Sequence, residues 1–204
     1  MSITIRDFPD LPKRRCDDLA SELQTGDLLL CSGTSVFAKL IQKASSSIWS
    51  HVGLVLRLDE IDSLLVLESV ESLGVRCVPL SHYVDGYGGY RQAYPGRALL
   101  ARHKGFAEAG RPDRLRDMAE FAFSLCGQRY DADAVLRLIA RIGQSIFGAT
   151  DEQAKQTQEY ISSEFVWRCY RACGIRIEYD ERGFLAPRDF AKAAEVTGLA
   201  ELRL

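Results

Sequence analysis

Three side chains of this sequence have the types needed for nucleophilic attack on a carbonyl group, namely Ser162, His51 and Glu68. A hydroxyl or thiol becomes an effective nucleophile when a histidine accepts its proton, and a carboxylate commonly orients that histidine. Ser162 lies in EYISSEFVWRCYRACG, where an apolar helical pattern begins that ends at Gly174. The unpaired N–H groups of a helix start carry positive partial charge, so they would favour a nucleophile there and stabilise an oxyanion.

The same serine also has a simpler interpretation. Serine is among the best helix N-cap residues, because its hydroxyl accepts a hydrogen bond from an unpaired main-chain N–H. This segment taken alone favours a cap at Ser162. The case for a nucleophile therefore depends on whether a histidine and a carboxylate reach the same place.

His51 and Glu68 are predicted to lie on paired strands. The sequences SHVGLVLRL and LLVLESV predict a β-hairpin, and a turn around Asp59 and Glu60 would set residue 51 opposite residue 68. Their Cβ atoms would then lie roughly 5 Å apart, so Glu68 could accept the N–H of His51 and fix its tautomer. A slip of one residue would separate them onto opposite faces, and Glu71 cannot share the face of Glu68 on a regular strand.

The rest of the chain predicts one α+β domain over residues 1–204, with residues 1–24 as an irregular N-terminal arm that leads into a short helix. GDLLLCSG and ALLARHK predict further strands, and GVRCVPLSHYV predicts extended chain. Helices are expected at SVFAKLIQKASSS, RLRDMAEFAFSLCG and ADAVLRLIARIGQSIFG, and ATDEQAKQTQ is expected to be a loop. Two helical stripes should face the core: Leu115, Met118, Ala119, Ala122, Phe123 and Cys126 in the first, and Phe165, Val166, Cys169, Tyr170 and Cys173 in the second.

Composition limits the classes of function. The chain has 204 residues, is 47% apolar and 26% charged, and has a formal net charge of −2, which gives no support to a nucleic-acid surface. No apolar run is long enough for a transmembrane helix. The first residues, MSITIRDFPDLPKRR, lack the apolar core of a secretory leader, so we expect a cytoplasmic protein.

Cysteine and histidine spacing predicts neither a disulfide scaffold nor a metal site, and no cofactor is expected. Six cysteines are present, and Cys169 and Cys173 belong to a helical apolar stripe, which favours core thiols in a reducing compartment. Cys31 ends an apolar strand and is also expected in the core. The three histidines, His51, His82 and His103, lack close ligand spacing, so a metal hydrolase is disfavoured.

Six short motifs together resemble the circularly permuted NlpC/P60 proteins, the papain-like group that includes YiiX/YaeF-type hydrolases and lecithin:retinol acyltransferase relatives. In order they are TGDLLL, SHVGLVL, VLES, GQRYD, YISSEFV and FLAPRDFA, and they run from Thr25 to Ala191. Each motif is weak singly, but their order and spacing are fairly specific. The resemblance implies a permuted papain-like fold: an antiparallel sheet packed against helices, with the nucleophile at a helix N-terminus.

The resemblance also implies roles for individual residues. His51 would be the general base, Glu68 its orienting partner, and residue 162 the nucleophile, where the family has cysteine and this chain has Ser162. Ser163 would lie beside the substrate, and so would Tyr160 unless it is only a packing aromatic. For three other matched residues a structural role is the default: Asp27 in a turn, and Tyr130 and Asp131 at the end of the middle helix.

The resemblance predicts a hydrolase or acyltransferase acting on an amide or ester, with a small-molecule, peptide or lipid acyl group as substrate. Ser162 leaves three interpretations open: a deliberate Cys-to-Ser replacement that inactivates a thiol enzyme, a native serine hydrolase, or a binding module without activity on the same fold. The intact motifs around Ser162 favour the first of these. A periplasmic substrate would require export without a signal peptide, as for a secreted effector.

Overall fold

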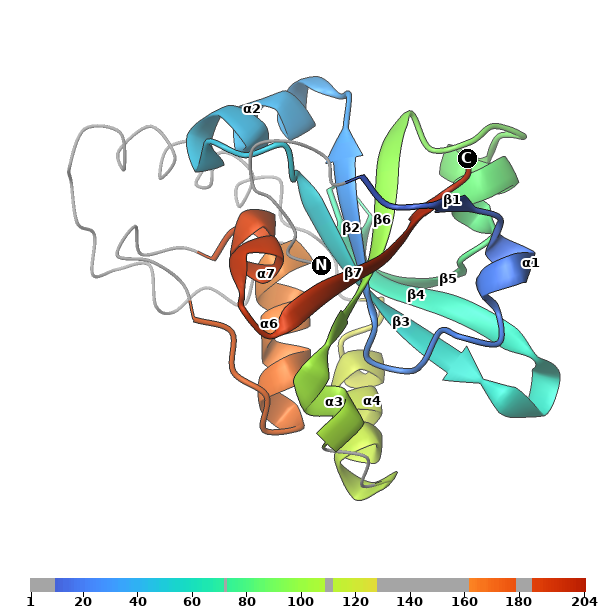
Figure 1. Ribbon diagram of the computed structural model, residues 1–204, viewed down its shortest axis with the longest axis vertical. Helices are drawn as coiled ribbons and strands as arrows, with labels where there is room; N and C mark the ends of the chain where they lie inside the picture. The colour runs from blue at the N-terminus through green and yellow to red at the C-terminus, as the bar shows by residue number, and fades with distance from the viewer. Residues whose placement is uncertain (1–9, 72, 109–111, 128–161, 179–184) are drawn as a thin grey trace.

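The computed structural model describes residues 10–71, 73–108, 112–127, 162–178 and 185–204. Their strands form a seven-stranded sheet in the order β1-β7-β6-β2-β3-β4-β5 (Figure 1). Neighbouring strands are antiparallel, as predicted, except that β1 and β7 run parallel. The strands are β1 (Lys13–Arg14), β2 (Leu28–Gly33), β3 (His51–Leu58), β4 (Ser63–Val70), β5 (Gly74–Pro79), β6 (Gly96–His103) and β7 (Val196–Leu202).

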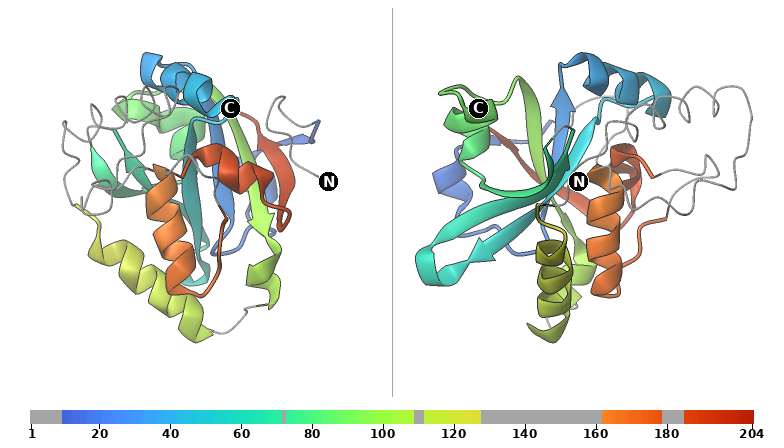
Figure 2. Two further views of the ribbon diagram at one scale, coloured as in Figure 1. Left: turned by 90° about the vertical axis from the view of Figure 1, so that its left-hand side faces the viewer. Right: turned by 180° about the vertical axis from the view of Figure 1, so that it is seen from behind.

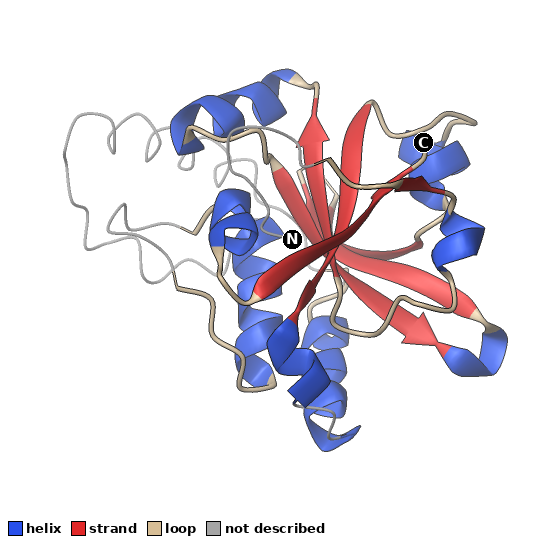
Figure 3. Cartoon of the chain, viewed as in Figure 1, coloured by secondary structure: helices blue, strands red, loops and turns tan. Residues whose placement is uncertain are grey.

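Helices lie in the connections between strands and surround the sheet (Figure 3). They are α1 (Cys16–Leu19), α2 (Val36–Ser45), α3 (Lys104–Glu108), α4 (Pro112–Ser124), α6 (Ser162–Ala172) and α7 (Pro187–Lys192). Three further helical segments are η1 (Asp59–Ile61), η2 (His82–Gly86) and η3 (Tyr87–Gly89). The mixture of one sheet with packed helices confirms the predicted α+β class.

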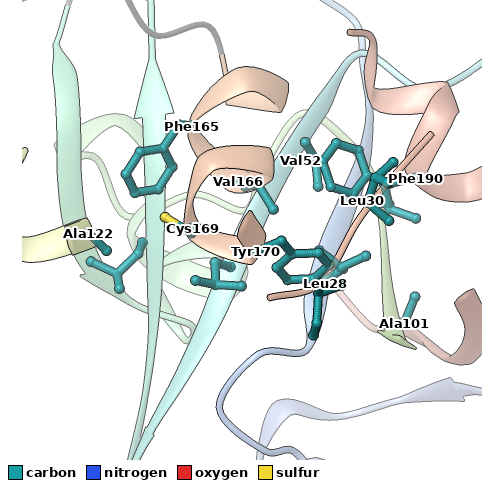
Figure 4. Packing of buried hydrophobic residues seen from close by; sticks show 14 of the residues in the cluster. Leu28, Leu30, Val52, Ala101, Ala122, Phe165, Val166, Cys169, Tyr170 and Phe190 are labelled. Atoms are coloured by element: carbon teal, nitrogen blue, oxygen red, sulfur yellow. The ribbon is translucent and has the colours of Figure 1, made fainter. Parts of the chain in front are cut away.

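One face of the sheet carries α6, which contacts β3 and β4 and is itself packed by α4 (Figure 2). The predicted α6 stripe is confirmed, since Phe165, Val166, Cys169 and Tyr170 are all fully buried (Figure 4). The Tyr170 hydroxyl also donates to the carbonyl oxygen of Gly26, 2.8 Å away. Packing and this hydrogen bond together fix where the first turn of α6 lies.

The other face of the sheet has its own apolar cluster. Leu28 and Leu30 of β2 belong to the α6 side, whereas Leu29 and Cys31 belong to the second cluster with Tyr83. Side chains alternate between faces along a strand, so a strand covered on both sides has a continuous apolar sequence. This explains the run LLLC.

The structure corrects the predicted apolar stripe of α4. Phe123 is 46% exposed, whereas Met118 and Ala122 are fully buried as predicted. Leu115 and Cys126 pack against the core and Ala119 is partly buried, so Phe123 is the one misplaced member of the stripe. The residues of a second predicted helix, 132–148, and of the loop 149–158 lie outside the described residues.

Other elements were not foreseen from the sequence. The strands β1 and β7 have no clear periodicity, and η2 is helical where extended chain was expected. Asp27, in contrast, has the structural role expected of it. It is buried, accepts a hydrogen bond from the N–H of Gln24, and receives both Nε and Nη2 of Arg102 at 2.7 Å.

Candidate active site

The predicted pair of His51 and Glu68 is present as a hydrogen bond. The His51 Nε2 atom lies 2.7 Å from Glu68 Oε2. The Glu68 side chain is completely buried, while 18% of the His51 side chain is exposed. His51 is the first residue of β3, so its ring lies at the start of the strand. No described residue forms a hydrogen bond with His51 Nδ1, and this nitrogen remains available for proton transfer.

The hairpin that joins the pair has a register two residues away from the predicted one. A turn at Asp59 and Glu60 implies Leu54 opposite Leu65, but Leu54 pairs with Leu67. The turn is longer than expected because η1 is followed by Asp62 in the left-handed conformation, with φ of 44°. An even shift keeps every side chain on its face, so His51 and Glu68 still meet, now as diagonal neighbours.

Two further residues hold Glu68, and sequence reasoning missed both. The Tyr83 hydroxyl donates to Glu68 Oε2 at 2.5 Å, and the Arg76 guanidinium contacts Oε1 at 2.7 Å. Arg76 pairs directly with Glu68 across β4 and β5, so a hairpin prediction extended to Gly74 would have found it. Tyr83 lies in η2 and had no periodic signal.

This network sets the charge of the carboxylate. Burial alone would raise the pKa of Glu68, but the hydrogen bond and charge of His51, the charge of Arg76 and the Tyr83 hydroxyl lower that pKa to about 2. Burial and the charge of Glu68 raise the pKa of Tyr83 well above its usual value, so the phenol stays a donor. The site therefore presents an ionised carboxylate to the imidazole over the physiological range.

Ser162 lines the same pocket as His51 and Glu68. It is the first residue of α6 and is partly buried. Between Ser162 and His51 there is no hydrogen bond. The other residues of the pocket wall are mainly apolar or small: Ser35, Phe37, Ala38, Ile41, Ser50, Ser69, Val70, Glu71, Tyr87, Tyr94, Ser163, Leu185, Ala186 and Pro187. The predicted convergence of three groups on one pocket is thus present, and the catalytic roles themselves stay predictions.

The other residues expected near the substrate have different outcomes. Tyr160 lies outside the described residues, as do Tyr130 and Asp131. The Ser163 side chain is buried and donates to the carbonyl oxygen of Leu185 at 2.7 Å, so its hydroxyl holds the pocket wall together. Glu71 lies beyond the end of β4 and lines the pocket, because the alternation that excluded it applies only within a strand.

Aromatic residues from the glycine- and tyrosine-rich stretch form the wall behind Glu68. The ring centroids of Tyr87 and Tyr94 lie 4.8 Å apart, and that of Tyr83 is 5.5 Å from Tyr87 and 5.3 Å from Tyr94. Tyr87 of the loop DGYGGY lines the pocket. Tyr90 of the same loop is 72% exposed and is not among the pocket residues.

The native cysteines are not alternative nucleophiles. All six are free thiols. Cys31, Cys169 and Cys173 are buried, as expected for core thiols, and burial raises the pKa of each. A raised pKa leaves little thiolate at neutral pH, so these thiols are poor nucleophiles.

Comparison with known proteins adds a fold relationship. No family model matches the sequence, and no curated protein matches it significantly. Among solved structures, the metalloprotein YiiX from Escherichia coli O157:H7, described as DUF1105, has a TM-score of 0.58 and 22% sequence identity. The match covers 87% of this chain and 97% of the YiiX chain. The chain therefore shares the YiiX-type fold.

The description of YiiX as a metalloprotein prompts a test of this chain's own residues. Among the residues that the structure describes, no three His, Cys, Asp or Glu side chains gather closely enough to hold a metal ion. The carboxylate oxygens of Glu68 are already engaged by His51, Tyr83 and Arg76. The described residues of the pocket do not fit a metal.

Among all the residues that the structure describes, no helix is both long and apolar enough to cross a bilayer.

Proposed function

We propose that this protein is a hydrolase or acyltransferase of the permuted papain-like NlpC/P60 type, with the nucleophile at position 162. One observation carries the proposal. A wholly buried glutamate binds His51 Nε2 at 2.7 Å, in a pocket that also contains the first residue of an 11-residue helix. Imidazole, carboxylate and helix start are the three components of a nucleophilic acyl-transfer site.

The bond to Glu68 assigns the two nitrogens of His51. Nε2 carries the proton that Glu68 accepts, so Nδ1 has the lone pair that would take a proton from residue 162. The deprotonated nucleophile would form a bond with the carbonyl carbon of the substrate. The unpaired N–H groups of the first turn of α6 would stabilise the oxygen that becomes negative.

The later steps return the proton. The tetrahedral adduct would collapse when the imidazolium of His51 gives its proton to the departing amine or alcohol. This leaves the acyl group as an ester or thioester on residue 162. Water, or another acceptor, would then lose a proton to His51 and form a bond with the acyl carbon. The bond between that carbon and residue 162 breaks as His51 returns the proton to residue 162. Glu68 stabilises the imidazolium in both halves and stays ionised.

A serine at position 162 weakens the first step. A hydroxyl loses its proton far less readily than a thiol, and a histidine that suits a thiol does not fully compensate. We infer that this chain has low activity and that Ser162→Cys restores it. The substrate class is an amide or ester of a peptide, an N-acyl amine or a lipid.

Turnover of model substrates tests the proposal. Ser162→Cys should hydrolyse a p-nitrophenyl ester and an acyl amide measurably faster than the unmodified chain. Mass spectrometry of quenched samples should detect the acyl group on the introduced thiol. Adding His51→Ala should abolish both signals, because His51 is the group proposed to accept the proton of residue 162.

A matched control separates reactivity from access. Ser35→Cys places a thiol in the same pocket, at the N-cap of α2 instead of the start of α6, and Ser35 forms no hydrogen bond with His51. That variant should form no acyl-enzyme. Absence of turnover and of acyl-enzyme in Ser162→Cys would contradict the enzyme proposal and favour a binding module on this fold.

A further inference from the structure

The helix α2 has an unusual order of side chains around its circumference. Each residue of an α-helix turns by about 100°, so residues four apart lie almost above one another. Lys39 and Lys43 form one row, and Val36 and Leu40 form the next row. Phe37 and Ile41 form the third row around the helix, and the buried residues Ala38 and Ser45 lie on the side opposite the first two rows.

The row of Val36 and Leu40 faces solvent. Val36 is 81% exposed and Leu40 is 38% exposed, although both are large apolar residues. The helix lies at the outer edge of the molecule (Figure 1). Adjacent exposed apolar residues at the rim of a pocket mark a candidate contact surface, because apolar surface in water is unfavourable.

The next row of the same helix belongs to the candidate active site. Phe37 and Ile41 are half-buried and line the pocket that contains Ser162 and His51. The apolar surface is therefore continuous from the solvent side of α2 into the pocket. A further apolar residue, Leu73, is 58% exposed and follows in sequence the pocket residues at the end of β4.

The charge of α2 indicates what the partner is. Lys39 and Lys43 are exposed, neither forms a salt bridge with a described residue, and the helix contains no acidic residue. A helix that lies in a membrane interface has lysines beside an apolar surface. In α2 the lysines lie beside the exposed row of Val36 and Leu40, and the next apolar row lines the pocket. The formal net charge of the chain is −2, so this positive patch is local.

We propose that α2 binds the surface of an anionic lipid bilayer and places the mouth of the active-site pocket against it. Val36 and Leu40 insert among the acyl chains, Lys39 and Lys43 contact anionic headgroups, and Phe37 and Ile41 form the path by which an acyl chain enters. This inference rests on the proposed function in that it names the partner of the same pocket, and it makes a lipid acyl group the favoured substrate.

Sedimentation with lipid vesicles tests the proposal without any turnover. The unmodified chain should bind vesicles of phosphatidylcholine with about 30 mol% phosphatidylserine, and bind those of phosphatidylcholine alone much more weakly. Raising the salt from about 0.1 M to about 0.5 M should release it, because headgroup charge is screened.

Surface variants then identify α2 as the binding element. The pair Val36→Ser and Leu40→Ser should lower the partition coefficient about tenfold or more, from the loss of buried apolar groups. The pair Lys39→Ser and Lys43→Ser should lower it by a similar factor, at low salt only. Ile61→Ser removes a residue that is 69% exposed in η1, far along the hairpin, and should leave binding unchanged.

Three results would overturn the proposal. The first is no vesicle binding by the unmodified chain, and the second is vesicle binding that neither pair of α2 substitutions weakens. The third is self-association of the chain that Val36→Ser with Leu40→Ser removes, because this would assign the patch to a second copy. Because each assay uses the chain as it stands, failure here leaves the acyl-transfer experiment unaffected. Conversely, vesicle binding by the unmodified chain together with no turnover by Ser162→Cys would support the surface and contradict the enzyme.

Discussion

At the scale of single residues, Glu68 is the centre of the site. Its two oxygens bind an imidazole, a phenol and a guanidinium, and none of its surface reaches solvent. A buried carboxylate without such partners would be protonated, because burial disfavours charge. Arg76 and Tyr83 are thus positioning residues that keep Glu68 ionised for His51.

The lowered pKa of Glu68 predicts how stability changes with acid. Its folded value is about 2 against an ordinary 4.5, so ionised Glu68 stabilises the fold by roughly 3 kcal/mol. This contribution is complete above about pH 4.5 and is lost as the pH falls toward 2. Urea unfolding at pH 7 and pH 3 should show a smaller difference for Glu68→Gln than for the unmodified chain.

A surface carboxylate provides the control for that measurement. The hydrogen bond from Arg14 also lowers the pKa of Glu22, but Glu22 is exposed to solvent. Glu22→Gln should retain nearly the full acid dependence, because exposed pairs contribute little. Equal loss of acid dependence in the Glu22 and Glu68 variants would contradict the central place given to Glu68.

Tyr83→Phe tests a positioning role with little change in packing. The ring would keep its contacts with Tyr87 and Tyr94, and the hydrogen bond to Glu68 would be lost. We expect acylation of the Ser162→Cys form to slow by about tenfold, since a hydrogen bond to a charged group contributes that much. The fall in rate on the acid side should also move to higher pH, because Glu68 would protonate more easily. A purely structural role would lower stability and leave the pH profile in place.

At the scale of elements, the position of residue 162 depends on how α6 is anchored at a distance. Tyr170 donates to the carbonyl oxygen of Gly26 across 144 residues of sequence, and its ring packs on Phe106 at 5.0 Å between centroids. We expect Tyr170→Phe to lower the free energy of unfolding by about 1 to 2 kcal/mol. Acylation of the Ser162→Cys form should be little affected well below the melting temperature, because the buried apolar stripe of α6 still holds the helix against the sheet.

The pairing of β3 and β4 offers a test through Gly53. A Cβ atom there would lie 2.8 Å from Val66 Cγ1 and 3.6 Å from Glu68 Cβ. Gly53→Ala should therefore displace Val66, disturb Glu68 and slow acylation. Adding Val66→Ala removes the obstructing methyl groups and should recover much of the rate. A rate equally low in the double variant would show that the methyl contact is not the cause.

The sequence predicted those elements whose pattern is local. The α6 stripe and the His51–Glu68 pairing followed from helical and strand periodicity, and the pairing survived an error of two residues because the error was even. The contributions of Arg76 and Tyr83 were missed because they depend on where separate segments meet. Residue Phe123 was misplaced because periodicity gives the width of an apolar face and not which edge of it packs.

At the scale of the whole molecule, both ends of the described chain belong to one sheet. Strand β7 near the C-terminus pairs with β6 and with β1, and the two apolar clusters share β2 as a common strand. We therefore expect a single cooperative unfolding transition. Far-UV circular dichroism and the combined fluorescence of Trp49 and Trp167 should give the same midpoint in denaturant. Two separated midpoints would contradict the expectation of one domain.

The reactivity of a thiol at position 162 measures the central claim most directly. In Ser162→Cys, the imidazole held by Glu68 and the start of α6 should keep much of the introduced thiol ionised. Its rate of alkylation by iodoacetamide at pH 6 should then lie near its rate at pH 8, and adding His51→Gln should remove this low-pH reactivity. A rate that falls roughly tenfold for each pH unit below about 8, as for an ordinary thiol, would contradict the account.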